Sequence, residues 1–257
     1  MPALNGHPVF LPERLRRWLA VGVLVLAASF TLDCGTSPEA HAERVRRARL
    51  GRPAPGAGSI VTYGPGGFCN VKPGVRVDPH VIFDRFPGSF GLGPDDRMVV
   101  YDSVIDNLGI EPMVHYRFQQ YHQGLVVENA VAIVHAKQGL AVSVNGDLRR
   151  GIEKLPRRRV SEPVALNAAM KAAGARIRPW EVDSIRRRPG VDSEMIARPS
   201  GVLVVIRPSD LGMSESDRHV VAWKFLIIPY PSYDPREVYI DATTGKVISN
   251  RSTIIVN

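Results

Sequence analysis

Three histidines are the first candidates for a chemical role in this chain. His115, His122 and His135 fall in neighbouring segments that the sequence predicts to be β-strands. Side chains on adjacent strands can converge on one metal ion, since neutral imidazole is a common metal ligand. Arg117, however, is expected on the same strand face as His115, and no carboxylate lies nearby in the pattern. The sequence therefore favours ordinary surface histidines and predicts no metal site.

Motifs of the common catalytic classes are absent from the sequence. No histidine is followed by glutamate and no two are four residues apart, so the chain has no zinc-binding His-Glu-x-x-His helix. It also has no Gly-x-Ser-x-Gly elbow and no phosphate-cradling loop. Asp241 precedes a predicted turn, which is an ordinary structural position for aspartate. We therefore expect a protein that is not an enzyme and that carries no cofactor.

The histidines belong to a predicted meander of three strands. Apolar and polar residues alternate from Val114 to Gln120, as on a half-buried strand. Gln123-Gly124 and Gln138-Gly139 supply tight turns, and Asn145-Gly146 ends the last strand with residues that tolerate positive φ. The segment therefore predicts an antiparallel sheet.

The residues before the meander predict less regular structure. Residues 51–75 contain seven glycines and four prolines, which predicts a loop or flexible leader, with much of 43–77 poorly ordered. Pro79–Phe86 is an apolar segment of one or two helical turns, which Pro87 and Gly88 are expected to interrupt. Met98–Asp102 is a further predicted strand.

A second block begins with a helix. Ser161 is a suitable N-cap, followed by Glu162 and Pro163 in the first turn, and Gly174 is expected to end the helix. Small apolar residues at four-residue spacing predict one packing stripe, made of Val164, Ala168 and Ala172 with Ala165 and Ala169 beside them.

Three apolar segments follow this helix. Residues 201–207, 219–228 and 237–249 are predicted strands, and Trp223 and Phe225 are expected to fill the core. The last segment contains a hairpin turn, Asp241-Ala-Thr-Thr-Gly245, in which Gly245 is the expected positive-φ residue.

The N-terminus predicts export. Arg14, Arg16 and Arg17 precede a short apolar run, and Ala40-His41-Ala42 forms a small-x-small cleavage site. We expect a signal peptide over residues 1–42 and a secreted or periplasmic protein. Lipidation of Cys34 is the alternative, and only then is a membrane partner expected. Asp33 is an unfavourable residue before a lipidated cysteine. Cleavage after Ala42 would leave Cys69 as the single cysteine, so the fold must hold without an internal disulfide.

The chain of 257 residues has a formal net charge of +8. The predicted signal peptide carries equal numbers of basic and acidic residues, so this charge remains after cleavage. Arginines cluster at 44–49, 149–150, 157–159 and 186–188. No aromatic residues are interleaved for base stacking, so nucleic acid is not an expected partner. Solvated linker charge is the default interpretation, and attraction to an acidic protein is the alternative.

Two sets of residues resemble known families. Gln119-Gln120-Tyr121-x-x-Gly124, followed by Val-Ser-Val-Asn145-Gly146, resembles the FTP domain of the propeptides of thermolysin- and fungalysin-type metalloproteases. The Ala-Trp-Lys-Phe strand and the hairpin with Asp241, Thr244 and Gly245 resemble a PepSY domain, which forms the second half of such propeptides.

The resemblance implies an α+β fold of two cystatin-like units, each a helix packed on an antiparallel sheet. The expected organisation is a signal peptide (1–42), a flexible leader (43–78), an FTP-like domain (79–148), a basic connector (149–160) and a PepSY-like domain (161–257). The protease domain that such propeptides accompany is missing from the sequence.

Such propeptides help to fold the protease and hold it inactive. The resemblance therefore implies an exported protein that binds, inhibits or assists the folding of a thermolysin-type metalloprotease in trans. The alternatives are a remnant propeptide of a truncated protease gene, or an extracytoplasmic envelope or ligand-binding module. A sharper form of the first hypothesis places the aliphatic residues Ile254, Ile255 and Val256 in the protease cleft as a strand-like inhibitor.

Overall fold

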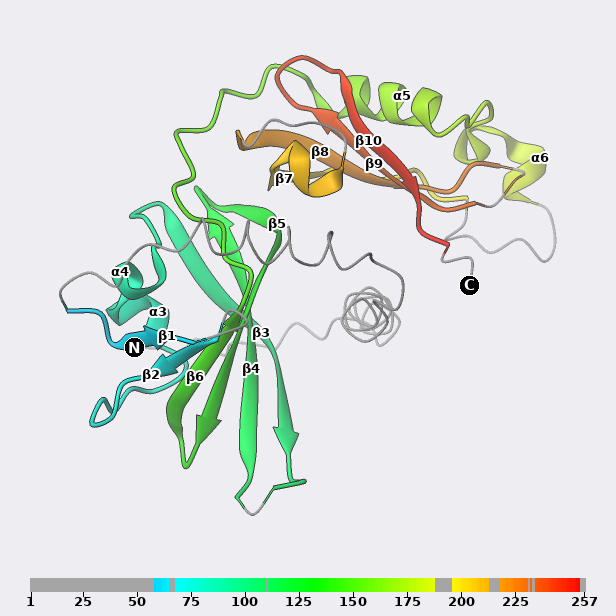
Figure 1. Cartoon of the computed structure of the whole chain (residues 1–257). Coiled ribbons are helices and arrows are strands. Elements are labelled where there is room, and N and C mark those ends of the chain that lie inside the picture. The colour runs from blue at the N-terminus through cyan, green and yellow to red at the C-terminus, as the bar shows by residue number, and fades with distance from the viewer. Residues whose placement is uncertain are drawn as a thin grey trace, which may run out of the picture. The chain divides into compact units, whose positions relative to one another are not determined.

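The computed structural model describes residues 58–64, 68–109, 111–187, 196–212, 218–230, 232 and 234–254 (Figure 1). The chain divides into two compact units, and every described residue belongs to the second, Pro53–Asn257. The predicted signal peptide, Cys34, Ile255 and Val256 lie outside the described residues. Within the described ranges, no helix has the length and apolar character needed to cross a membrane.

Strands make up most of the regular structure. They are β1 (Val61–Tyr63), β2 (Cys69–Val71), β3 (Asp96–Asp106), β4 (Met113–His122), β5 (Leu125–Lys137), β6 (Leu140–Gly146), β7 (Val202–Ile206), β8 (Val220–Ile227), β9 (Arg236–Asp241) and β10 (Val247–Ser252). The helices are α3 (Ile82–Arg85), α4 (Pro87–Phe90), α5 (Glu162–Ala172) and α6 (Asp183–Arg186), with 3-10 turns η2 (Pro179–Glu181) and η3 (Pro208–Leu211).

One strand, β5, joins the two halves of the chain. Strand β4 pairs with β5 along one edge, antiparallel and over nearly its whole length. The other edge is shared, because β6 pairs with residues 132–137 and β7 pairs in parallel with Val126 and Val127. From β7 the sheet continues antiparallel through β8, β9 and β10. The described strands therefore form a single hydrogen-bonded sheet in place of two separate ones.

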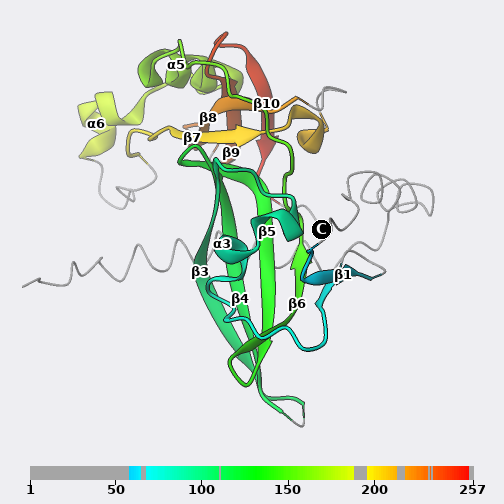
Figure 2. The same ribbon diagram turned by 90° about the vertical axis from the view of Figure 1, so that its left-hand side faces the viewer.

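The first half packs its core beneath short elements. The rings of Phe83, Phe90 and Phe118 meet edge to face, with centroids 4.8 and 5.0 Å apart. Figure 2 shows α3 lying against the face of the sheet formed by β3–β6. The expected short helix is confirmed as α3. Pro87 follows α3 and is also the first residue of α4. Proline is tolerated there because the backbone N–H of the first helical residue makes no hydrogen bond within the helix.

Part of the predicted flexible leader belongs to this fold. Strands β1 and β2 pair with each other, and β2 pairs with β6 through Cys69 opposite Val144. The expectation of a loop is wrong for these residues, because Ile60, Val61 and Cys69 bury apolar side chains in the first core. The glycines and prolines lie mainly around these two short strands.

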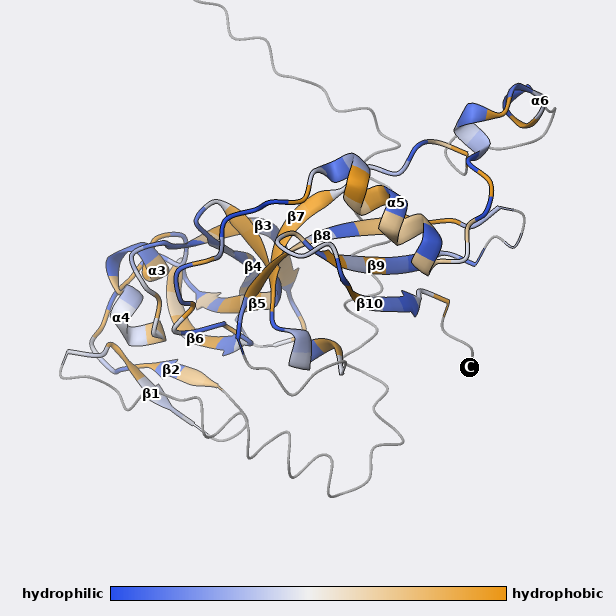
Figure 3. Cartoon of the chain, turned by 90° about the horizontal axis from the view of Figure 1, so that it is seen from above, coloured by the Kyte–Doolittle hydropathy of each residue, from blue (hydrophilic) through white to orange (hydrophobic). Residues whose placement is uncertain are grey.

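The second half is a helix on a sheet. Helix α5 packs its buried side chains, Ala165, Leu166, Ala169 and Met170, against β8 and β9. The predicted stripe is shifted, because Val164 is exposed while Ala168 and Ala172 are only partly buried. Alanines at the contact allow the helix to lie close to Trp223 and Phe225, which fill the core as expected. Strand β7 is hydrophobic along its length (Figure 3).

The chain is therefore α+β with a predominance of sheet. A helix on an antiparallel sheet describes the second half. In the first half, two four-residue helices lie on the sheet and β1 and β2 extend it beyond β6. The expected arrangement of two cystatin-like units stays a prediction.

Candidate functional site

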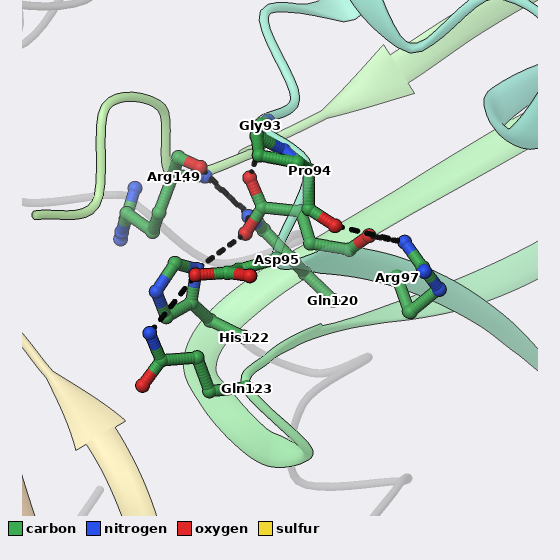
Figure 4. Close-up of polar contacts among 9 residues, drawn as sticks. Gly93, Pro94, Asp95, Arg97, Gln120, His122, Gln123 and Arg149 are labelled. Atoms are coloured by element: carbon green, nitrogen blue, oxygen red, sulfur yellow. Dashed lines mark hydrogen bonds and ion pairs between the residues drawn. The ribbon is translucent and has the colours of Figure 1, made fainter. Parts of the chain in front are cut away.

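The Gln-Gln-Tyr-x-x-Gly motif forms the buried polar centre of the first half (Figure 4). Gln120 is fully buried on β4. Its Nε2 donates to the carbonyl of Arg149 at 2.7 Å and to Asp96 Oδ1 at 3.2 Å, while its Oε1 accepts from the Arg149 N–H at 2.9 Å. The amide is thus satisfied on both sides and fixes the connector to β3 and β4.

Asp96 completes this centre. Its Oδ2 accepts the Gly93 N–H at 2.7 Å, and its Oδ1 lies 2.9 Å from His122 Nδ1. Both side chains are buried, so the carboxylate is held by a histidine, a backbone amide and Gln120 together. Among its neighbours, His122 Nε2 has no hydrogen-bond partner. These contacts hold β3, β4 and the Gly93 turn together.

Gln119 holds an irregular part of β5. Its Nε2 lies 2.8 to 3.1 Å from the carbonyls of Gln120, Val127 and Ala130. At this point the register between β4 and β5 shifts, since Gln119 lies opposite Val131 but Tyr121 lies opposite Val126. The side-chain amide therefore binds backbone carbonyls that the bulge removes from the ladder.

The other FTP-like motif residues have backbone roles. Gln123 and Gly124 both have positive φ, as do Gln138 and Gly139, which confirms the two predicted tight turns. Gly146 has φ of 133°, and a Cβ there would lie 2.2 Å from the carbonyl oxygen of Val131. Only glycine fits at this position. Asn145 Oδ1 accepts from His135 Nε2 at 2.9 Å.

The PepSY-like hairpin is also structural. Asp241 Oδ1 accepts the N–H groups of Thr243 and Thr244 at 2.7 and 2.9 Å, and Gly245 has φ of 74°. Thr244 Oγ1 accepts the Lys246 N–H at 3.3 Å. The carboxylate of Asp241 is therefore occupied by its own turn. Ile254 is 53% exposed, which leaves it available to a partner.

An ionic cluster joins the two halves beside the β5–β7 pairing. Glu128 on β5 contacts Lys224 Nζ at 2.7 Å and Tyr239 Oη at 3.2 Å, and Glu237 also pairs with Lys224 at 2.9 Å. Burial alone would lower the pKa of Lys224, but the two carboxylates outweigh it and raise that pKa. Burial, with Glu128, raises the pKa of Tyr239.

A second set of contacts between the two halves involves Arg149, which was expected to carry solvated linker charge. Arg149 is buried, and its guanidinium contacts Asp210 at 3.0 Å. Arg207 pairs with the same carboxylate at 2.7 Å. Burial lowers the pKa of His219, and the positive charges of Arg207 and Arg149 lower it further.

Other connector arginines also have structural contacts. Arg150 Nε donates to the Phe90 carbonyl at 2.9 Å, and the Arg158 guanidinium lies 5.5 Å from the Trp223 ring centroid. The interpretation as solvated linker charge is therefore wrong for Arg149 and Arg150, whereas Arg158 is exposed. Sequence reasoning missed them because their partners lie up to some sixty residues away in the chain.

The three histidines divide between the two faces of the sheet. His122 is buried with Asp96 on one face. His115 and His135 lie directly opposite one another on β4 and β5, with their Nδ1 atoms 2.6 Å apart. Across the described parts of the chain, no group of three or more histidine, cysteine, aspartate or glutamate side chains is arranged to hold a metal ion.

Strand β3 offers a candidate contact surface. Among the described strands it pairs only with β4, along one edge, and it presents apolar side chains to solvent. Ile105 is 63% exposed, and the surface, called here the β3 surface, consists of Val99, Val100, Tyr101, Val104 and Ile105. Exposed apolar side chains that gather along one edge strand are typical of interaction surfaces.

Comparisons with known proteins give one family match, and it lies in the first half. Residues 96–148 match the family model described as Fungalysin/Thermolysin Propeptide Motif. A similar solved structure is the C-terminal domain of Bacillus megaterium YpeB, at 12% sequence identity and a TM-score of 0.32, covering 75% of this chain and 74% of that one. No curated protein matches. The predicted FTP resemblance is thus confirmed over β3–β6, and the PepSY resemblance stays a prediction.

Proposed function

We propose that this chain is an exported, propeptide-like protein that binds a thermolysin-type zinc metalloprotease in trans and inhibits it or assists its folding. The observation that supports this most is the propeptide motif over residues 96–148. Its Gln119, Gln120, Gly124, Asn145 and Gly146 are all built into an ordered framework. These residues hold backbone in place, so we assign function to a surface.

The β3 surface is the part of this framework that we assign to the protease. Its apolar side chains and its free strand edge match what an extended segment of a partner needs, namely backbone hydrogen bonds and apolar contact. In this proposal the second half is a PepSY-like domain, and Ile254 begins a tail that lies in the protease cleft.

The test is a titration of thermolysin-type proteases with residues 43–257. We expect saturable inhibition, a stoichiometric complex on size exclusion and slow proteolysis of the bound chain. Refolding of the denatured protease with and without the chain measures the folding role. A folded chain that neither binds, inhibits nor assists any enzyme of a thermolysin-type panel would overturn the proposal and favour the remnant propeptide or the envelope module.

Two variants locate the contact. Ile105→Lys should weaken inhibition, whereas Leu226→Lys, an exposed apolar residue of the second half, is the matched control that should not. Removal of residues 254–257 tests the tail. Thr253 is kept because its N–H donates to the Pro235 carbonyl at 2.8 Å. A folded truncation that inhibits like the full chain would contradict the tail hypothesis.

A further inference from the structure

Two histidines on the face opposite the buried core are positioned as a pair. His115 on β4 and His135 on β5 are Cα partners, and their rings meet nearly at right angles, at 83°, with centroids 4.7 Å apart. The two Nδ1 atoms are 2.6 Å apart. At this distance a proton on one Nδ1 is hydrogen-bonded to the lone pair of the other, because two facing lone pairs would repel, and a metal ion that replaces this proton would lie between the rings.

The outer nitrogen of each ring faces an oxygen. His135 Nε2 lies 2.9 Å from Asn145 Oδ1, which can only accept, so Nε2 carries the proton and Nδ1 carries the lone pair. His115 Nε2 lies 3.9 Å from Asp106 Oδ2. In both rings the nitrogen that faces the other ring is therefore Nδ1, so an ion that displaces the proton between them meets one Nδ1 atom from each ring. Metal-binding histidines commonly have outer nitrogens held in this way.

The two sequence features that disfavoured a metal are changed by the fold. The positive charge of Arg117 is neutralised by Asp102, whose Oδ2 lies 2.9 Å from the guanidinium. A carboxylate, Asp106, lies near His115 although it is distant from it in the strand pattern. The pair is also reachable from solvent, since the His115 side chain is 24% exposed.

We propose that His115 and His135 bind one divalent transition-metal ion through their Nδ1 atoms, with Asn145 and Asp106 orienting the rings and water completing the coordination. Imidazole ligands and the order of metal affinities select Cu²⁺ most strongly, followed by Ni²⁺ and Zn²⁺. Metal–nitrogen bonds of about 2.0–2.1 Å place two ligand nitrogens about 3 Å apart, so the rings must separate by less than about 1 Å.

The experiment is a titration of tag-free residues 43–257 with CuCl2, followed by calorimetry and by electron paramagnetic resonance. We expect one ion per chain, with nitrogen couplings from two imidazoles. His115→Ala and His135→Ala should each abolish this signal, whereas His80→Ala, at an exposed histidine of the same half, should keep it. Asn145→Ala should weaken binding by about tenfold.

Either of two results would overturn the proposal. If the folded wild-type chain binds no Cu²⁺, Ni²⁺ or Zn²⁺, or if both alanine variants bind as it does, the site does not exist. Nitrogen-15 spectra of the histidine side chains would then identify a proton shared between the two Nδ1 atoms. Circular dichroism of each variant, with His135→Gln as a second replacement, separates loss of the ligand from loss of the fold.

Discussion

The two halves of the sheet are stabilised by different means. In the first half, the side chains that fix β3, β4 and the connector are buried and polar, with Gln120, Asp96 and His122 bonded to one another or to backbone. In the second half, α5 covers the sheet with Ala165 and Ala169 and no comparable polar centre lies among the described side chains of that core. A polar centre fixes one register, because every partner must be present, whereas an apolar face tolerates substitutions of similar volume.

The largest expected effect is at Gly146. A Cβ there would contact Val131 backbone at 2.2 Å, and the residue has φ of 133°, so Gly146→Ala should cost about 3 kcal/mol or more of unfolding free energy. Urea unfolding measures this. Gly139→Ala is the matched control, since it also has positive φ but open space around the Cβ, and it should cost about 1 kcal/mol. Equal losses of unfolding free energy would show that the positive φ, and not the contact with Val131, determines the cost of the substitution.

A direct comparison of the two halves pairs Gln120 with Met170. Gln120→Leu leaves the Arg149 N–H and C=O without their partner and removes one hydrogen bond from Asp96, which keeps Gly93 and His122, so it should cost about 2–4 kcal/mol. Met170→Leu changes shape but leaves no polar group unpaired, and should cost less than about 1.5 kcal/mol. If denaturant midpoints fall equally for both variants, the proposed difference between polar and apolar stabilisation is wrong.

A smaller effect is expected where the halves meet. Glu128→Gln removes the charge that holds Lys224 and should cost about 1–2 kcal/mol, with Glu237 keeping part of the interaction. Thermal unfolding at low and high salt is the measurement. The exposed Glu111→Gln serves as control. A loss no greater than that of the control would mean that β5–β7 pairing alone joins the halves.

The smallest effect concerns pH. The pKa of His219 is lowered by burial and by Arg207 and Arg149, so the unfolded chain takes up a proton first as the pH falls. Its contribution to stability is therefore complete above about pH 7 and declines as the pH falls below about 6.5. His219→Gln should flatten the dependence of Tm on pH between about 5 and 7. An unchanged slope would assign the acid sensitivity to other groups, of which His135 is the first to test.

The strands and turns could be predicted because their signals are local. Alternation from Val114 to Gln120 and the Gln-Gly pairs identify the meander, and the boundaries of β8 and β9 follow apolar runs. Met98–Asp102 captured only part of β3, because Asp102 and Ser103 interrupt the apolar residues before Val104 and Ile105. Strands β1 and β2 were missed, since three-residue strands between glycines carry almost no periodicity.

The positions of the site residues needed the tertiary structure. The motif residues could be selected from the sequence, but the contact of Gln120 with Arg149 spans 29 residues and no sequence pattern predicts it. The approach of Asp106 to His115 likewise depends on the register of β3 against β4. The shift of the helical stripe toward Ala165 reflects which side of α5 faces β8, which spacing alone leaves open.

The parallel pairing of β5 with β7 has a consequence for the order of folding. The edge of β5 that receives β7 is complete only after β6, the connector and α5 have followed it in the chain. Until then, the folding chain presents an open, apolar strand edge, and such edges pair with other chains. Closure also depends on contacts that are remote in sequence, which form slowly. The stage most vulnerable to self-association is therefore the interval between formation of the meander and arrival of β7.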